Sequence, residues 1–433
     1  MVQIETLPNG VRLVTEAIPA VRSAALGIWV GGGSREETAE ESGASHFIEH
    51  MLFKGTASRT AQDLARQTDA IGGQMNAFTT KECTCFYARV LDEHLPQALD
   101  ILWDMVYHSS FTQEAVETER GVILEEIDMY EDTPDDLCAE KLAAQVFQGS
   151  ALARPILGAK ETLAEMTGDS LRAYHHSHYQ GHNTVVSLAG SFSPALLDEL
   201  RRRFAALPAG SPRPLVPAAY TPGFVVTPKP IEQNHLTLAF PGLDYNSPRR
   251  FALQLLSSIL GGGVSSRLFQ QVREQQGLCY SIYSYGAGHA DTGLFCVYTA
   301  LNRETEDKAL TTIRQGGSRS VMITYNPETV STDSDVPTEG PTDEELSRAR
   351  EQSKANVMMS LESTQSRMSH AGRSLLFSGE ILTPEQILAA YDAVTRADVV
   401  ALAQDIFRWD QVSLSAVGQV RRAEAYQSLL LNQ

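Results

Sequence analysis

The five residues His46-Phe-Ile-Glu49-His50 constrain this chain more than any other feature, because their chemistry requires a helix. Side chains three and four positions apart lie on one face of a helix, so the two histidines stack one turn apart with Glu49 beside them. Neutral imidazole nitrogens bind Zn²⁺ well, and Ser42 or Ser45 is placed to cap such a helix. The motif predicts a metal site with a base next to it. The alternative is a core helix that carries two hydrogen-bonded histidines.

A third ligand must come from elsewhere in the chain, since zinc in proteins takes more than two. Residues 112–132 read as a long acidic helix. In it Glu119, Val122, Ile123 and Glu126 follow the spacing of one helical face, which puts two carboxylates on an apolar stripe. A carboxylate that faces a core needs a partner, so these two are candidate site residues. The remaining glutamates of the helix are expected in solvent: Glu114, Glu117, Glu125 and Glu131.

Three segments resemble the pitrilysin-type inverted-zincin metallopeptidases, in the branch of the mitochondrial processing peptidase β-subunit and its bacterial homologues. They are residues 43–56, residues 119–126 and Arg273-Glu-Gln-Gln-Gly-Leu-Cys-Tyr280. The family's third ligand is a glutamate seventy-six residues after the second histidine, which is Glu126 here. The resemblance also implies that Glu119 supports the site and that Arg273 and Tyr280 reach over to the substrate and the zinc.

This resemblance implies a zinc-dependent endopeptidase that holds one Zn²⁺ per chain through His46, His50 and Glu126. Its substrates would be peptides or unfolded, presequence-like segments, hydrolysed inside a closed chamber. Glu49 would then be the general base that takes a proton from the attacking water. Two rival classes are a catalytically silent scaffold or partner subunit and a zinc-binding module without hydrolytic activity.

The expected partners are peptides and a second protein chain. Residues 72–79 resemble the family's edge strand, onto which an extended peptide adds as a further strand; the alternative is an ordinary paired strand. Within this run the candidate substrate-binding residues are Asn76, Ala77 and Phe78. A homodimer is the simplest expectation, and a heterodimer with an inactive relative comes second. A net charge of −18 argues against nucleic acid as a ligand, because a phosphate backbone requires a basic face.

The domain organisation follows from length and proline content. A chain of 433 residues is too long for one ordinary domain, and seven prolines crowd residues 206–232. The sequence therefore predicts a catalytic lobe over 1–210, a linker over 211–224 and a second lobe over 225–433. Similar orders of helices and strand-like runs in the two halves indicate an internal duplication. Each lobe is expected to be α+β, with a mostly antiparallel or mixed β-sheet and helices packed on one face.

The remaining features set the compartment and the loops. No apolar run approaches the length of a membrane span, and five scattered cysteines suggest a reducing compartment. Cytoplasm is the expectation, with a mature organellar protein as the alternative. Residues 316–340 read as a long polar loop, which departs from the family pattern. Thr342 and Glu345 predict the start of a helix after it.

Two further clusters in the sequence are candidate sites. His175, His176, His178 and His182 lie close in sequence, but adjacent side chains on a helix diverge, so solvated histidines at a helix end are expected there. Residues 261–263 are all glycine and lack the lysine and hydroxyl of a phosphate-binding loop. They are expected to break a helix.

Overall fold

The computed structural model describes residues 2–319 and 340–431, which form two compact units. The first unit consists of Met1–Met129, Arg154–Val216 and Met358–Leu382. The second consists of Tyr130–Ala153, Pro217–Val357 and Thr383–Gln433. Each unit therefore takes most of its residues from one half of the chain and a shorter segment from the other half. The expected division into two contiguous lobes differs from this arrangement.

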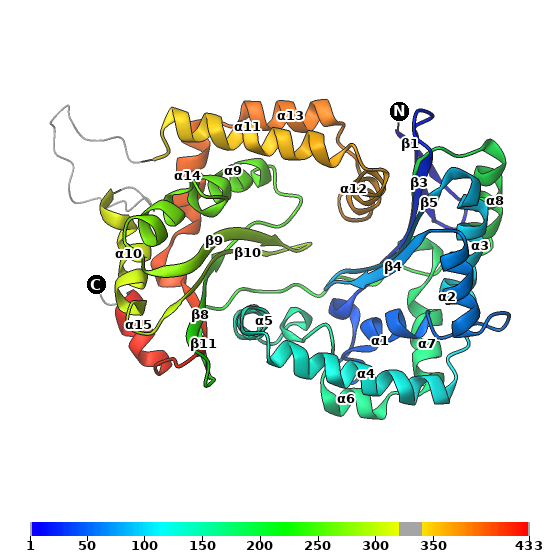
Figure 1. Cartoon of the computed structure of the whole chain (residues 1–433), viewed down its shortest axis with the longest axis horizontal. Helices are drawn as coiled ribbons and strands as arrows, with labels where there is room; N and C mark the ends of the chain where they lie inside the picture. Colours follow the sequence, from blue (N-terminus) through cyan, green and yellow to red (C-terminus); the bar gives the residue numbers. More distant parts are fainter. Residues whose placement is uncertain (1, 320–339, 432–433) are drawn as a thin grey trace. The chain divides into compact units, whose positions relative to one another are not determined.

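The first unit is built on a six-stranded sheet in the order β1-β2-β6-β3-β5-β4 (Figure 1). Its neighbouring strands run antiparallel, except that β2 and β6 are parallel. The strands β1 and β4 form the two edges. In chain order the strands are β1 (Val2–Thr6), β2 (Arg12–Ala17), β3 (Ser23–Gly31), β4 (Gln74–Thr79), β5 (Cys83–Leu91) and β6 (Thr184–Gly190).

The second unit is built on a five-stranded sheet in the order β7-β11-β8-β10-β9. Its one parallel pair is β7 and β11. This pattern repeats the β2-β6-β3-β5-β4 part of the first sheet, including the position of the parallel pair, which confirms the duplication and the mixed α+β class. The strands are β7 (Phe224–Pro228), β8 (Gln233–Pro241), β9 (Cys279–Gly288), β10 (Gly293–Asn302) and β11 (Ser413–Gly418).

Helices cover both faces of the first sheet, because its central strand is apolar on both sides. In β3, Leu26 and Ile28 join the main core, whereas Ala25 and Trp29 face the opposite way. The main core lies under helices from the first half of the chain. The opposite face is covered by α12 (Thr364–Phe377), which comes from the second half (Figure 1). The predicted helices on one face are present, and α12 covers the other face, which the sequence did not predict.

The contact between α12 and the first sheet is close. A Cβ atom at Gly372 would lie 2.2 Å from Nε1 of Trp29, and one at Gly27 would lie 2.4 Å from Sδ of Met368. The Trp29 indole also donates a hydrogen bond to Ser187 Oγ at 2.9 Å. Glycine at these two positions lets the helix approach the strands, and larger residues would separate them.

One face of the second sheet is covered by a helix from the first half of the chain. Leu142 and Val146 of α5 (Pro134–Val146) pack against Ala239 of β8 and Cys296 of β10. The two halves thus exchange one helix each. Because each sheet needs cover on both faces, both exchanged helices bury apolar surface that would otherwise face water.

The other helices follow the sequence pattern. In the first unit they are α1 (Ala44–Met51), α2 (Ala61–Ala70), α3 (Leu95–His108), α4 (Gln113–Glu131), α6 (Lys160–Glu165), α7 (Gly168–His178) and α8 (Pro194–Phe204). In the second they are α9 (Arg250–Gly261), α10 (Glu306–Arg319), α11 (Asp343–Ser360), α13 (Pro384–Ala393), α14 (Arg396–Ile406) and α15 (Ala423–Leu431). The end of α9 at Gly261 agrees with the expected break at the glycine run.

Two predicted loop features have different outcomes. Thr342 and Glu345 form the predicted capping box at the start of α11, since each side chain accepts a hydrogen bond from the other residue's backbone amide at 3.1 and 2.7 Å. The polar loop predicted over 316–340 lies, from 320 to 339, outside the described residues. Its first four residues continue α10 and are helical.

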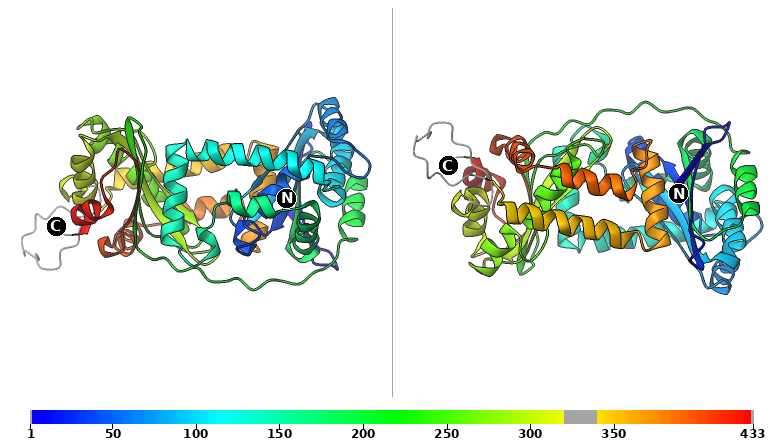
Figure 2. Two further views of the ribbon diagram at one scale, coloured as in Figure 1. Left: turned by 90° about the horizontal axis from the view of Figure 1, so that it is seen from below. Right: turned by 90° about the horizontal axis from the view of Figure 1, so that it is seen from above.

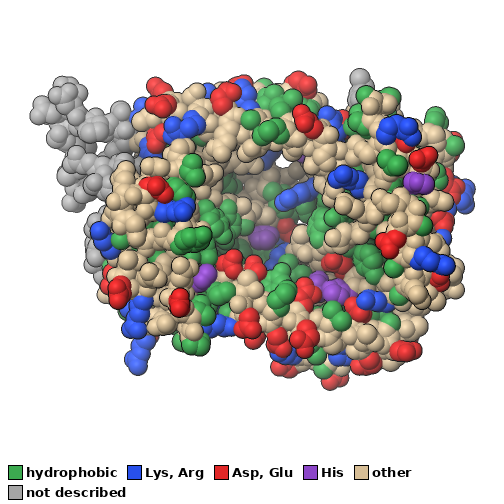
Figure 3. Space-filling view, in the orientation of Figure 1, with side chains coloured by type: hydrophobic (Ala, Val, Ile, Leu, Met, Phe, Trp, Pro, Cys, Tyr) green, Lys and Arg blue, Asp and Glu red, His purple; other side chains and the backbone are tan. Residues whose placement is uncertain are grey.

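Residues 208–223 form a proline-rich segment without helix or strand, which Figure 2 shows as an extended trace. Acidic and basic side chains are interspersed over the face drawn in Figure 3, so the excess of negative charge is not a field of one sign there. Within the described part of the chain, no helix is long and apolar enough to cross a membrane.

Candidate metal centre

The metal-site helix α1 begins in a way that the sequence did not reveal. Neither Ser42 nor Ser45 caps it through a side chain. The buried carboxylate of Glu37 accepts hydrogen bonds from the amides of Gly43 and Ser45 at 2.9 and 2.8 Å instead. A serine hydroxyl was the expected cap, but here an acid from a preceding turn meets the unpaired amides and the positive end of the helix dipole. Burial raises the pKa of Glu37, and these hydrogen bonds oppose that rise.

Glycine is required just before this helix. Gly43 has a φ of 99°, a left-handed conformation, and a Cβ atom there would lie 2.8 Å from the carbonyl oxygen of Leu157. A side chain at this position would be strained in both respects. Gly43 therefore sets the direction in which α1 enters the core.

Three side chains predicted as metal ligands converge in the first unit. Oε2 of Glu126, on α4, lies 3.6 Å from Nε2 of His46 and 3.5 Å from Nε2 of His50. The potential ligand atoms of the three residues all lie within 4.8 Å of one another. Among residues 2–319 and 340–431 this is the one group of three histidine, cysteine or acidic side chains arranged to hold a metal ion.

The geometry fits zinc. Tetrahedral bonds of about 2.0–2.2 Å place neighbouring ligand atoms about 3.3–3.6 Å apart, which agrees with the two distances from Glu126 Oε2. Burial, with a smaller contribution from His50, lowers the pKa of His46 to about 4. This keeps the His46 imidazole neutral, as a metal ligand must be. Two nitrogens and one oxygen from the protein leave a fourth position open for water.

Glu119 contacts Nδ1 of His50, the ring nitrogen on the side away from Glu126. Its Oε2 lies 3.1 Å from Nδ1 of His50, and its Oε1 lies 2.6 Å from Nζ of Lys54. Glu119 is 2% exposed. The hydrogen bond to Nδ1 leaves Nε2 of His50 facing the metal position, which is how carboxylates commonly orient metal-binding histidines. Burial lowers the pKa of His50, but hydrogen bonds with Glu126 and Glu119 outweigh it, and the net direction is upward.

The helical face predicted for α4 is partly correct. Glu119 and Ile123 are buried, but Val122 is 47% exposed, so the apolar stripe is narrower than the spacing suggested. The four glutamates expected in solvent are all exposed: Glu114, Glu117, Glu125 and Glu131.

Glu49 lies next to the candidate ligands on α1, and its carboxylate is hydrogen-bonded to a residue of the sheet. Thr79 Oγ1, at the end of β4, donates a hydrogen bond to Glu49 Oε2 at 2.6 Å. Burial raises the pKa of Glu49, and the bond from Thr79 opposes this rise. A raised pKa makes a carboxylate a stronger base, which suits a role in proton transfer.

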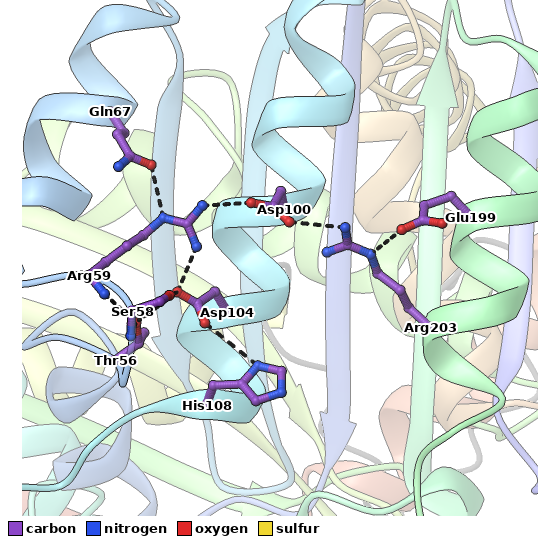
Figure 4. Close-up of polar contacts among 9 residues, drawn as sticks. All are labelled: Thr56, Ser58, Arg59, Gln67, Asp100, Asp104, His108, Glu199 and Arg203. Carbon is purple, nitrogen blue, oxygen red and sulfur yellow. Dashed lines mark hydrogen bonds and ion pairs between the residues drawn. The ribbon is translucent and has the colours of Figure 1, made fainter.

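The turn that follows α1 is fixed by charged side chains (Figure 4). Asp104 on α3 accepts hydrogen bonds from Thr56, Ser58 and Arg59 at 2.7, 2.8 and 2.6 Å. Arg59 also bonds to Asp100 at 2.6 Å. These contacts tie the turn after the metal-site helix to α3.

The predicted substrate strand β4 is an edge strand, and no other described strand pairs with its outer side. Asn76 Oδ1 accepts a hydrogen bond from the Ala77 amide at 2.9 Å. The ring of Phe78 meets Trp29 edge-on at 5.6 Å. The open edge satisfies the geometric requirement for strand addition.

Arg273 and Tyr280 lie in the second unit, whereas the three ligands and Glu49 lie in the first. Arg273 belongs to a short π-helix, Phe269–Glu274. Its guanidinium carbon lies 4.5 Å from the ring centre of Phe269 and 5.7 Å from that of Tyr280. Tyr280 is 72% exposed, so its hydroxyl is accessible from solvent.

The histidine-rich helix end is a structural feature, but the histidines are not all solvated as expected. His175 and His178 are each 4% exposed. His175 Nε2 donates to the Val106 carbonyl at 2.7 Å, and His178 Nδ1 donates to the Tyr174 carbonyl at 2.8 Å. Burial lowers the pKa of each to about 4, so both are neutral core residues. Their hydrogen-bond partners explain how imidazoles can be buried there.

Sequence reasoning assigned no role to Glu37, Lys54 or Thr79. Lys54 follows His50 by one helical turn, and this spacing could have indicated a contact with the same neighbours. Thr79 ends the run 72–79 that resembles the family's edge strand, but nothing in the sequence indicated its contact with Glu49. Glu37 carries no local signal, because its role depends on a turn that only the folded chain forms.

The fold and the donor set together define a class of protein, the two-lobed α+β proteins with an inverted zinc-peptidase motif. Residues 12–160 match the family described as insulinase (peptidase family M16), and residues 165–319 match the peptidase M16 inactive domain. The chain belongs to peptidase family M16.

Similar proteins match this chain over nearly its whole length and support its membership of the family. The chain is 41% identical over 412 residues to the uncharacterized zinc protease YmxG of Bacillus subtilis, covering 95% of this chain and 97% of the relative. It is also 41% identical over 430 residues to an uncharacterized zinc protease of Streptomyces coelicolor, covering 97% and 90%. The solved peptidase M16 inactive domain from Pseudomonas fluorescens has a TM-score of 0.86 at 20% identity, covering 97% of this chain and 98% of that one, which shows the shared fold.

Proposed function

We propose that this chain is a zinc-dependent endopeptidase that hydrolyses peptides or unfolded, presequence-like segments. The observation that carries the proposal is the convergence of His46, His50 and Glu126, with the carboxylate of Glu49 beside them and bound to Thr79. A purely structural zinc site needs no such base. The names of the relatives as zinc proteases support the choice of metal, and one set of ligands implies one ion per chain.

The chemistry divides between the metal and the chain. A zinc ion held by His46, His50 and Glu126 would supply the Lewis acidity that activates water and polarises the scissile carbonyl. Glu49 takes the proton of the attacking water and then delivers it to the leaving amine. Glu119 and Lys54 hold His50 in position throughout.

Substrate recognition is proposed to use the backbone. An extended peptide adds to the open edge of β4 at Asn76, Ala77 and Phe78, and the Asn76 side chain moves off the Ala77 amide to let it bind. Contacts of this kind read the peptide backbone more than its side chains, so sequence preference should be loose. The resemblance adds two further parts to the proposal, a closed chamber that restricts substrates to unfolded chains and a role for Tyr280, with Arg273, as donor to the developing oxyanion.

A peptide-cleavage assay tests the proposal. The zinc-loaded chain should cleave a quenched fluorescent peptide, a chelator should stop cleavage, and added zinc should restore it. Glu49→Gln should keep its zinc and lower kcat by about a thousandfold or more, because the general base is lost. A wild-type chain that binds zinc but cleaves no peptide would favour a silent scaffold instead. Equal loss of zinc from the Glu49 variant would contradict its role as base.

A further inference from the structure

Thr79 occupies the point where the edge strand β4 meets the metal-site helix. Its hydroxyl oxygen lies 2.6 Å from Glu49 Oε2 and 3.3 Å from Thr84 Oγ1, on the neighbouring strand β5. Thr84 is 1% exposed. The Thr79 hydroxyl therefore has two polar neighbours, one from the site and one from the sheet.

The direction of these hydrogen bonds follows from the chemistry of the groups. An ionised carboxylate can only accept, so Thr79 donates its proton to Glu49. The Thr79 oxygen is then free to accept the proton of the Thr84 hydroxyl. Among the described residues, Thr79 is the one that forms a hydrogen bond with the Glu49 carboxylate, and it leaves Oε1 available.

The backbone N–H and C=O of Thr79 point away from β5, toward the open edge of the sheet. The Thr80 amide donates to the Cys83 carbonyl at 2.8 Å, at the turn between β4 and β5. Bonded and non-bonded pairs alternate along an antiparallel ladder. The amides and carbonyls of Met75, Ala77 and Thr79 therefore point away from β5, on the side where a further strand would add.

We propose that Thr79 is a positioning residue for Glu49. Its hydroxyl fixes Oε2 of the carboxylate so that Oε1 is directed at the attacking water. Because the same residue presents its backbone to the open edge, an added peptide strand and the base are held by one rigid segment. This inference rests on the proposed peptidase function, and it assigns Thr79 no part in holding the metal.

The test compares variants that separate the hydroxyl from the shape of the side chain. Thr79→Val keeps the branched shape and β-propensity but loses the donor, and Thr79→Ser keeps the donor. A hydrogen bond to a charged group corresponds to a rate effect of about ten- to a hundredfold, so kcat of Thr79→Val should fall by that factor. KM should stay within about twofold, and Thr79→Ser should recover most of kcat. Thr15→Val, on β2 of the same sheet, is the matched control and should keep wild-type kcat.

Two measurements besides turnover are needed. Zinc affinity, measured by competition with a chelator, should be the same in Thr79→Val and the wild type. A crystal structure of the variant should show the Glu49 side chain displaced or in several rotamers. If Thr79→Val fails to fold, Thr79→Ala replaces it, with the same expectations.

The outcomes are distinguishable from failure of the proposed function. If the wild type cleaves peptides and Thr79→Val keeps its kcat, this inference is wrong and the peptidase assignment stands. A change confined to KM would mean that Thr79 serves only the edge strand, and loss of zinc would mean that it serves the metal site; either result overturns the inference. If the wild type itself cleaves no peptide, the proposed function fails first.

Discussion

Three side chains near the metal position are joined by hydrogen bonds and an ion pair. His50, Glu119 and Lys54 form a continuous chain of contacts at 3.1 and 2.6 Å, and the carboxylate in the middle is almost fully buried. A buried charge is stable only when its partners are in place. Lys54 therefore matters to the metal ligand through Glu119, although it would not contact the metal itself.

Replacing Lys54 with methionine should weaken zinc binding. The variant leaves Glu119 without its cation, so the carboxylate is less firmly held against His50, and loss of such a supporting partner typically costs about ten- to a hundredfold in metal affinity. Chelator competition measures the change. Lys160→Met, which removes a surface ion pair with Asp128, should leave the affinity unchanged. Unaltered zinc affinity in Lys54→Met would show that the contact with Glu119 has no influence on the ligand.

The buried histidines make stability depend on pH. His175 has a pKa of about 4 in the folded chain and an ordinary value near 6.5, because burial disfavours its charged form. Above the ordinary value both states are neutral, and this residue has no effect on stability. As the pH falls from about 6.5 to about 4, only the unfolded chain gains the proton, so folding is weakened by an amount on the order of 3 kcal/mol.

Denaturation with urea across this pH range tests the effect. Stability of the wild type should fall between pH 6.5 and 4, and His175→Phe should make the fall shallower, with His178 still contributing. His176→Gln, on the exposed side of the same helix, should leave the pH dependence as it is. If His175→Phe has the same dependence as the wild type, His175 is not the neutral core residue described here.

Among the elements, α1 depends most on a residue outside it. Glu37→Gln removes the charge and turns one acceptor into a donor that faces the amides of Gly43 and Ser45. The free energy of unfolding should fall by about 1–3 kcal/mol, the usual cost of a lost cap or buried partner. Chemical denaturation measures it, with the exposed Glu40→Gln as control. Equal stability of the two variants would show that another group caps this helix.

The sequence predicted the elements well where their pattern is local. The metal-site helix, the acidic helix with Glu119 and Glu126, and the repeated strand order all follow from side-chain periodicity. The cap by Glu37 could not be predicted, since it depends on a turn whose course is set by tertiary contacts. The burial of His175 and His178 was missed because a run of histidines reads as polar, and nothing local shows that the distant Val106 carbonyl accepts a hydrogen bond from His175.

The exchange of helices was missed for a different reason. The sequence of β3 shows that both of its faces are apolar, but not which distant helix covers the second face. The complementary surfaces are Gly27 and Trp29 on the strand and Met368 and Gly372 on α12. These residues lie more than three hundred positions apart, so no local pattern connects them.

At the scale of the whole molecule, the duplication gave two similar sheets, but the described residues contain one candidate metal site, which lies in the first copy. The helix α1 carries the histidines, and the helix that follows β8 in the second copy, α9, is apolar and buries Leu255, Leu256 and Ile259. One copy therefore provides the metal ligands, and the other retains Arg273 and Tyr280.

We propose that the chain forms a homodimer. The resemblance implies that two chains pair to enclose a chamber, and this chain contains both the candidate metal ligands and the Arg273–Tyr280 pair, so an inactive partner is not required. Light scattering after size exclusion should give about twice the mass of one chain. A monomeric mass at working concentrations that still cleaves peptides would rule this expectation out.

The zinc content of the purified chain, measured beside that of Glu126→Gln, tests the central claim most directly. Three ligands from two distant segments predict one zinc ion per chain in the wild type and loss of most of it in the variant, because two imidazoles alone hold zinc weakly. Glu114→Gln, an exposed change on the same helix, should keep a full equivalent. A Glu126→Gln chain that retained one tightly bound zinc ion would contradict the account.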